Sequence, residues 1–221
     1  MDINILKLNL IIESDIKKSD ADRIRGYLGN LFWDNPNAHH HKSDGSFIYR
    51  YPCVQYKVID GSCILIGFKE GVDIIKKTFH DLNKINLGGS WCEILSKGLE
   101  SYKAIFQIAS EHLSYSFLTP WLALNEKNYE KYQKLGRWIE RKELLESILI
   151  GNIISISKSL GYTVDEPITA KIIDMKEVNT RLKGTPMLGF LGTFSVNFEI
   201  PDYWGIGKSV SRGFGTIRRC R

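Results

Sequence analysis

The sequence predicts an α+β protein made of two units, each a β-sheet with helices packed against it. Two patterns support this fold class. Runs of alternating apolar residues, typical of strands, are interspersed with segments whose apolar residues recur at spacings of three and four, typical of helices. The length of 221 residues suits one large domain or two small ones, and contents of 43% apolar and 25% charged residues are ordinary for a globular protein.

The chain opens with a predicted strand and helix. Residues 2–13 alternate between apolar and polar side chains. Ser19 and Asp20 can cap a helix that ends before Pro36, because the residue before a proline avoids the helical region. The predicted apolar face of this helix consists of Ala21, Ile24, Leu28 and Leu31.

A hairpin, a second helix and a strand complete the first half. Residues 47–59 and 63–68 are predicted strands joined at Asp60-Gly61, a pair typical of hairpin turns. A strand over 88–95 follows the helix, so the order is β-α-β-β-α-β, the ferredoxin-like arrangement. The apolar face of this second helix consists of Val72, Ile75, Phe79 and Leu82.

The second half predicts another β/α sandwich. At least one strand lies within 104–124, a short helix covers 125–135, and strands cover 168–175, 187–200 and 214–220. The strongest helix of the chain spans 137–160, with Gly161 closing it. Its predicted apolar stripe is Trp138, Leu145, Leu149, Ile153, Ile156 and Leu160. We expect two domains, 1–97 and 98–221.

The composition excludes several classes of protein. The cysteines, at 53, 63, 92 and 220, form no CxxC pair, which argues against a zinc ribbon. No run of about 18 apolar residues predicts a membrane span. The N-terminus lacks the basic region and the cleavage site of a signal peptide. We therefore expect a cytoplasmic protein with free thiols and no membrane partner.

Positive charge gathers at the end of the chain. The net charge is +5, and the five basic residues from Lys208 to Arg221 have no acidic residue among them, so the rest of the chain is neutral overall. A basic end on a neutral body favours a local site for an anion, of which nucleic acid is the usual one. A solvated basic tail is the alternative.

The same region is rich in glycine, with the sequence GIGKSVSRGFG over 205–215. It is not a mononucleotide-binding phosphate loop, because that motif requires a glycine where this chain has Asp202. Glycines such as Gly213 and Gly215 allow the main chain to approach an RNA phosphate, and Lys208 and Arg212 add charge. The alternative is a long hairpin loop at the edge of a sheet.

Three consecutive histidines, His39, His40 and His41, form the clearest candidate for a catalytic group. In an extended loop His39 and His41 share a face. Two side chains that titrate near neutral pH can act as base and acid in RNA cleavage by the 2′-hydroxyl, without a metal. The alternatives are a metal site with Asp34 and Asp44, which completes no convincing ligand set, or a solvated cluster.

Three segments together resemble a known family. They are RGYLGNLFWDNPNAHHHKSDGSFIYRYPCVQYKVIDG (25–61), TPWLALNEKNYEKY (119–132) and GIGKSVSRGFGTIRR (205–219). The chain resembles the CRISPR-associated endoribonucleases that process repeat transcripts, most closely the branch with an HxH motif found in methanogens and some bacteria. The resemblance implies two tandem ferredoxin-like (RRM-like) βαββαβ domains with a C-terminal glycine-rich loop.

The resemblance also implies a reaction and its residues. Cleavage is metal-independent, needs no cofactor, and leaves a 5′-hydroxyl and a 2′,3′-cyclic phosphate. By position, His39 and His41 match the catalytic pair, although His40 can replace either. Tyr49 matches a supporting tyrosine if the preceding loop has one extra residue. The implied partner is CRISPR repeat RNA; a CRISPR effector complex and a second copy of the chain are further candidates.

Two further roles come from chemistry. Arg50 is expected to contact RNA phosphate, and Lys57 to stabilise the negative phosphorane, the alternative being an ordinary exposed lysine of a strand. The competing function is that of a non-catalytic RNA-binding subunit of an effector complex, which would keep the glycine-rich loop but has no need of paired histidines.

Overall fold

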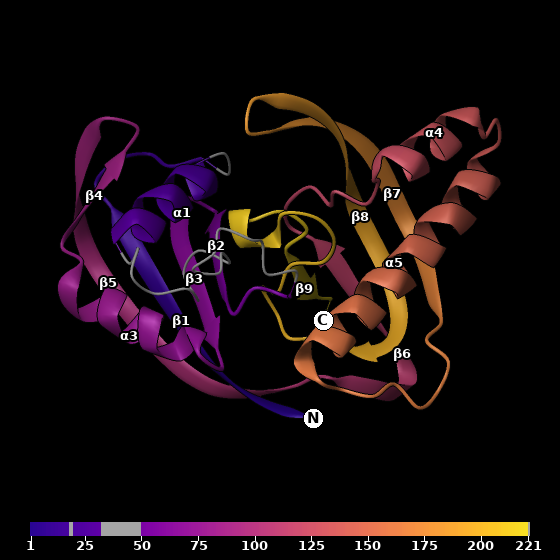
Figure 1. Cartoon of the computed structure of the whole chain (residues 1–221), viewed down its shortest axis with the longest axis horizontal. Helices are drawn as coiled ribbons and strands as arrows, with labels where there is room; N and C mark the ends of the chain where they lie inside the picture. Colours follow the sequence, from indigo (N-terminus) through magenta and orange to yellow (C-terminus); the bar gives the residue numbers. More distant parts are fainter. Residues whose placement is uncertain (18–19, 32–49, 221) are drawn as a thin grey trace, which may run out of the picture. The chain divides into compact units, whose positions relative to one another are not determined.

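The computed structural model describes residues 1–17, 20–31 and 50–220. They form two compact units (Figure 1). The N-terminal unit comprises residues 2–104 together with Val210–Gly213, and the C-terminal unit comprises Met1, residues 105–209 and the chain from Phe214 onward. A four-residue piece of the glycine-rich region therefore belongs to the N-terminal unit.

The N-terminal unit contains a five-stranded sheet of order β2-β3-β1-β5-β4. β1 and β2 both pair antiparallel with β3. The predicted hairpin is confirmed, because Asp60 and Gly61 join β2 to β3 with φ angles of 50° and 74°, the left-handed pair that a two-residue turn requires. Its elements are β1 (Asp2–Ile12), α1 (Asp20–Leu31), β2 (Val54–Ile59), β3 (Ser62–Phe68), α3 (Gly71–Asp81), β4 (Lys84–Leu87) and β5 (Ser90–Ile105).

The core of this unit lies between the sheet and the helices α1 and α3. Most of the predicted helical faces are confirmed, with Ile24, Leu28 and Ile75 at 0% exposure in one cluster with Leu8 of β1. The prediction for Leu31 is wrong, because this side chain is 48% exposed. The last buried residue of α1 is Gly29, two residues before Leu31.

The C-terminal unit contains a four-stranded sheet of order β7-β8-β6-β9, and α5 packs against β7 (Figure 1). Gly161 ends α5 in the left-handed conformation, with φ of 75°. The predicted stripe of α5 is buried except for Trp138, the first residue of the helix, which is 47% exposed. The elements are β6 (Gln107–Phe117), α4 (Glu126–Lys134), α5 (Trp138–Leu160), β7 (Ala170–Leu182), β8 (Thr185–Glu199) and β9 (Ile217–Arg219).

Both sheets have the ferredoxin-like order, in which the first strand lies in the middle beside the third and the last. The expected α+β fold with two tandem sheet-and-helix domains is confirmed. In the C-terminal unit the second crossover, from β8 to β9, is not an α-helix. It is the glycine-rich chain, whose only helical turn is the 3₁₀ turn η1 (Val210–Arg212).

Strands β2, β4, β5 and β7 differ from the sequence prediction. β2 begins at Val54, so residues 50–53 of the predicted strand 47–59 lie outside it, and β7 continues to Leu182 instead of ending at 175. β5 runs for 16 residues instead of the eight expected, and the short strand β4 was not predicted. Most residues of β5 are exposed or half-buried, so the strand carries little of the alternation on which the prediction depends. The expected domain boundary between residues 97 and 98 falls inside β5, whereas the compact units divide after Ala104.

The stability of the C-terminal unit is expected to depend on the buried stripe of α5. Leu149→Ala removes a side chain of 0% exposure and should lower the free energy of unfolding by about 2–5 kcal/mol. Ile154→Ala, on the same helix but 47% exposed, should change it by less than about 0.5 kcal/mol. Urea unfolding of both variants measures the difference. Equal effects would contradict the packing described.

Candidate functional site

The catalytic residues predicted from the sequence lie outside the described residues. His39, His41 and Tyr49 all fall within residues 32–49, and their roles stay predictions. The other predicted residues lie in two places. In the N-terminal unit, Arg50 precedes β2 and Lys57 lies within it. The other four residues, Lys208, Arg212, Gly213 and Gly215, lie in residues 205–217, which we call the glycine-rich segment.

The glycine-rich segment is held by close contacts of the main chain. Gly213 and Gly215 have φ angles of 86° and 61°. A Cβ at Gly213 would lie 3.0 Å from the carbonyl oxygen of Tyr56, and one at Gly215 would collide with the carbonyl oxygen of Ile206. Both positions therefore require glycine for packing within the protein, whatever they contact in a ligand.

The amide groups of these two glycines already have acceptors. The N–H of Gly213 donates to the carbonyl of Val210 at 3.1 Å, and that of Gly215 donates to the carbonyl of Pro120 at 2.9 Å. The N–H of Ile206 in turn donates to the carbonyl of Gly215 at 2.9 Å. The segment is thus a closed main-chain structure that supports its side chains, Lys208 and Arg212 among them.

Lys208 and Arg212 lie in different surroundings. Lys208 is exposed, and its N–H donates to the carbonyl of Leu122 within the C-terminal unit. Arg212 belongs to η1 and forms an ion pair with Asp22 of α1, which leaves its side chain 17% exposed. Desolvation lowers the pKa of Arg212. The sequence predicted the charge of Arg212 but could not predict this partner.

Lys57 is fully buried, so the alternative of an exposed strand lysine is wrong. Its side chain has 0% exposure, and Nζ donates to Gln55 Oε1 at 2.9 Å. Desolvation lowers the pKa of Lys57 to about 7. β2 lies at the edge of its sheet but all six of its residues are buried, because α1 and η1 pack against it.

Two further polar groups of the same region were not predicted from the sequence. The hydroxyl of Tyr56 and Nε of Arg25 are buried and have no hydrogen-bond partner among residues 1–17, 20–31 and 50–220. Burial raises the pKa of Tyr56 and lowers that of Arg25. Nothing in the sequence pattern marks Arg25, because an arginine in the middle of a helix usually points to solvent. We call Arg25, Arg212 and Asp22, the counter-ion of Arg212, the basic cluster. Lys57 lies on the other face of β2 from Tyr56, because side chains alternate along a strand.

Arg25 and Lys57 lie on the elements that flank the histidines in the chain. α1 ends at Leu31 and β2 begins at Val54, so residues 32–49 connect the two elements that carry Arg25 and Lys57. Arg50 follows directly and pairs with Glu70 at 3.7 Å. A group of cations with one acidic partner, partly desolvated, is suited to stabilise negative charge on a bound phosphate.

Two absences apply to residues 1–17, 20–31 and 50–220. No group of three or more His, Cys, Asp or Glu side chains in these ranges is arranged to hold a metal ion. No helix in the same ranges has the length and apolar character needed to cross a membrane.

Comparison with known proteins identifies the family over nearly the whole chain. The model of the Cas6b N-terminal domain matches residues 1–104, and that of the Cas6b C-terminal domain matches residues 107–220. The chain belongs to the Cas6b family. The resemblance to CRISPR-associated endoribonucleases is thereby confirmed, whereas the assignment to a branch with an HxH motif stays a prediction.

Two solved structures agree with this assignment, and the chain is also similar to one curated protein. A crystal structure of Cas6b matches with a TM-score of 0.91 and 36% identity over 100% of both chains. The structure of a CRISPR RNA processing endoribonuclease Cas6b matches with a TM-score of 0.79 and 34% identity, again over 100% of both. The uncharacterized protein MJ0978 of Methanocaldococcus jannaschii is 42% identical over 139 residues, which are 63% of this chain and 94% of the relative.

The buried lysine predicts a specific pH dependence of stability. Because the pKa of Lys57 falls from 10.5 to about 7 on folding, the unfolded chain binds more protons between these values. The free energy of unfolding should therefore rise with pH in this window, by up to about 1.4 kcal/mol per pH unit, and Lys57→Met should lack this rise. Urea unfolding from about pH 6 to pH 10 compares the two proteins.

The control for this experiment is Lys76→Met, which alters an exposed lysine of α3. It should keep the pH dependence of the wild-type protein. Parallel curves for wild type and Lys57→Met across the window would contradict the lowered pKa of Lys57.

Proposed function

We propose that this chain is a metal-independent endoribonuclease that cuts CRISPR repeat transcripts into guide RNAs. The observation that carries the proposal is membership of the Cas6b family over both domains, together with 34% identity over the full length to a CRISPR RNA processing endoribonuclease. Arg25 and Lys57 support it, because they lie on α1 and β2, the two elements that the histidine segment joins, and Arg212 adds a cation paired with Asp22 of α1.

The proposed reaction is a transesterification within the RNA. The 2′-hydroxyl upstream of the cut attacks its neighbouring phosphate, and the bond from phosphorus to the 5′ oxygen breaks. One of His39 and His41 takes the 2′ proton, and the other gives a proton to the leaving 5′ oxygen. The products are a 2′,3′-cyclic phosphate and a 5′-hydroxyl, with Tyr49 supporting the pair.

Lys57 and Arg25 are suited to the charge that develops on the phosphorane. The transition state gains negative charge on the non-bridging oxygens, which desolvated cations stabilise more strongly than hydrated ones do. With a pKa of about 7, Lys57 also titrates near physiological pH. In the structure as described its ammonium group has 0% exposure, so this role requires RNA binding to open a path to Nζ.

The glycine-rich segment is proposed to bind the RNA backbone. Lys208 is exposed and supplies a cation directly. Arg212 supplies a second cation once Asp22 yields to a phosphate, which is a stronger acceptor for a guanidinium fork. Gly213 and Gly215 fix the path of the main chain beside these cations. Arg50 reaches phosphate by exchanging Glu70 in the same way.

The experiment that tests the function is cleavage of the cognate repeat RNA by the full chain in EDTA. We expect one cut, a 2′,3′-cyclic phosphate end, and no cutting of RNA with a 2′-deoxy nucleotide upstream of the cut. His39→Ala and His41→Ala should each slow cleavage by about 10²–10⁴-fold while RNA binding is retained, as befits loss of an acid or a base.

His40→Ala is the matched control and should cleave at nearly the wild-type rate. Cleavage at the wild-type rate by both His39→Ala and His41→Ala would refute the catalytic pair. Loss of activity in EDTA would refute the metal-independent reaction. Tight binding without any cutting would favour the competing function, a non-catalytic RNA-binding subunit of an effector complex.

The pairing of Arg212 with Asp22 gives a second test. If Arg212 contacts phosphate, Arg212→Ala should weaken RNA binding and reduce the slope of log K against log[salt] by about 1. Asp22→Asn removes the competing carboxylate but keeps the arginine, so it should bind RNA at least as tightly as wild type.

Thermal unfolding separates this role from a purely structural one. If Arg212 serves only to hold η1 on α1, both variants should lose stability and weaken RNA binding together, with an unchanged salt slope. That pattern would remove Arg212 from the proposed RNA-binding residues.

A further inference from the structure

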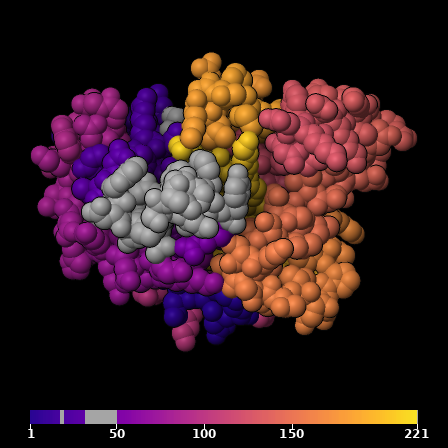
Figure 2. All heavy atoms as spheres, in the orientation of Figure 1, coloured from indigo at the N-terminus to yellow at the C-terminus, as the bar shows by residue number. Residues whose placement is uncertain are grey.

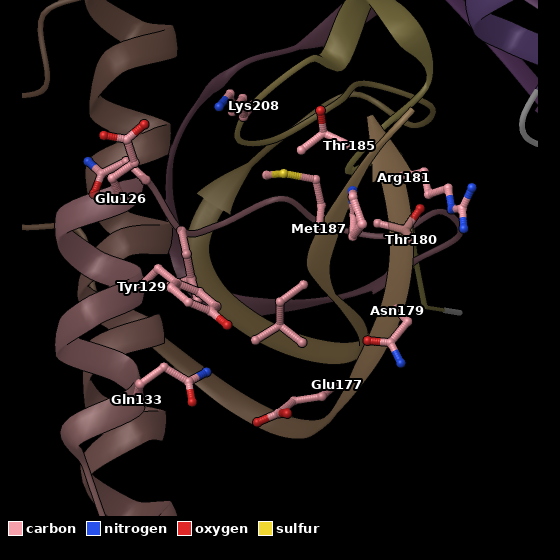
Figure 3. Close-up of a pocket in the computed structure, with 14 residues that line it drawn as sticks. Glu126, Tyr129, Gln133, Glu177, Asn179, Thr180, Arg181, Thr185, Met187 and Lys208 are labelled. Atoms are coloured by element: carbon pink, nitrogen blue, oxygen red, sulfur yellow. The ribbon is translucent and has the colours of Figure 1, made fainter. Parts of the chain in front are cut away.

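A cavity of about 810 Å³ lies within the C-terminal unit. One wall is α4, the other is the hairpin of β7 and β8, and Lys208 of the glycine-rich segment lies at one end (Figure 3). Both walls reach the surface on the face shown in Figure 2, α4 in salmon and the hairpin in orange. Its volume falls within the range of roughly 300–1,000 Å³ that is typical of small-molecule sites.

An exposed aromatic ring dominates one wall. Tyr129 is 46% exposed, and its ring projects from α4 toward the hairpin, as does the side chain of Gln133 one turn later (Figure 3). Met187 points into the space from the opposite wall, and Leu124 and Leu188 add apolar surface. A flat group entering here meets a ring on one side and aliphatic side chains on the other.

The charges of the cavity are separated along its length. Lys208 lies at one end, and Glu126, an exposed residue at the start of α4, lines the same half of the cavity. Glu177 lies at the other end, where it accepts a hydrogen bond from Tyr132 Oη at 2.8 Å and pairs with Arg141 at 3.4 Å. Arg181 points away from the cavity in Figure 3. An anionic group is therefore favoured only beside Lys208, and an uncharged group with hydrogen-bonding edges is favoured beside Tyr129 and Gln133.

The position of Lys208 is fixed by the packing of its neighbours. A Cβ at Gly207 would lie 2.6 Å from Trp121 Nε1, a nitrogen that donates to Asn152 of α5 at 3.1 Å. The main chain of Gly207 thus lies directly on a buried indole, and the N–H of Lys208 donates to the carbonyl of Leu122. The main chain of Lys208 is consequently held on the same C-terminal unit as α4, and its position does not depend on a bound ligand.

The geometry points to a nucleotide subsite, in which an unpaired base of the RNA stacks on Tyr129 and its phosphate binds Lys208. This inference rests on the proposed function, since it gives the repeat RNA a second contact on the C-terminal unit. The cavity matches three parts of a nucleotide. The aromatic ring and the aliphatic side chains opposite it match the faces of the base, the amide side chains match its hydrogen-bonding edge, and the cation matches the phosphate. The subsite contributes to affinity and register, not to bond breaking.

The test is a double-mutant cycle between protein and RNA, using the full chain. We expect Tyr129→Ala to weaken binding of the repeat RNA by about 10-fold, as loss of one stacked base does, with an unchanged cleavage rate at saturating RNA. A set of repeat RNAs, each with one abasic nucleotide, should contain a position that weakens binding to wild type by a similar factor. At that position the abasic change should have almost no effect on Tyr129→Ala.

Three variants control for unrelated effects. Tyr129→Phe keeps the ring and should bind like wild type. Trp138→Ala removes an aromatic side chain of 47% exposure outside the cavity and should also bind like wild type. Lys208→Ala should reduce the salt slope of binding by about 1, whereas Tyr129→Ala should leave it unchanged.

Two results would overturn the subsite. One is wild-type affinity of Tyr129→Ala. The other is additivity at every position. If the binding free energy lost in Tyr129→Ala adds in full to the loss caused by each abasic substitution, no base stacks on the ring. Neither result affects the proposed function, because cleavage by the wild-type protein is measured in the same samples. Conversely, a wild-type protein that binds the repeat RNA without cutting it would refute the endoribonuclease function. The double-mutant cycle would still test the subsite, because it measures binding.

Discussion

The fold of the glycine-rich segment depends on main-chain contacts that are too close for any side chain. At Gly207 the chain crosses Trp121, at Gly213 it crosses the carbonyl of Tyr56, and at Gly215 it returns past Ile206. These contacts replace the second helix of a ferredoxin-like unit, which would normally cover the sheet by side-chain packing. Main-chain hydrogen bonds within the segment and to Pro120 and Leu122 hold its path, along which Lys208 belongs to the C-terminal unit and Arg212, in η1, to the N-terminal unit.

Burial of charge is the second constraint on this molecule. Removing Lys57 from water costs free energy, which appears as the lowered pKa, and the unpartnered Arg25 Nε and Tyr56 hydroxyl add to that cost. Replacing such groups with apolar ones is often neutral or stabilising, so their presence is better explained by a ligand than by stability. A phosphate at Arg25 would supply a negative charge and an acceptor for its Nε. The desolvation free energy of these groups in the free protein would then be offset when RNA binds.

The two regions proposed to bind RNA differ in their physical character. The basic cluster is desolvated and is suited to stabilising charge that changes during a reaction. The cavity beside Tyr129 is open, partly apolar and carries one cation, and is suited to holding a group that does not change. An endoribonuclease must select one phosphodiester among many that are chemically identical. Contacts away from the cleavage site can fix the register of the RNA, while the basic cluster acts on the phosphate that is cut.

The sequence by itself determined the order of most helices and strands, because their apolar residues face one core and recur with the period of the element. It also determined the Asp60-Gly61 hairpin, the glycine-rich segment and the family resemblance. It missed β4 and half of β5, whose exposed residues carry little apolar alternation. Only the tertiary structure decided that Lys57 is buried, that Arg212 faces Asp22, and that Tyr129 and Lys208 share a cavity. Those facts depend on residues far apart in the chain, and no local period or composition encodes which distant group a side chain will meet.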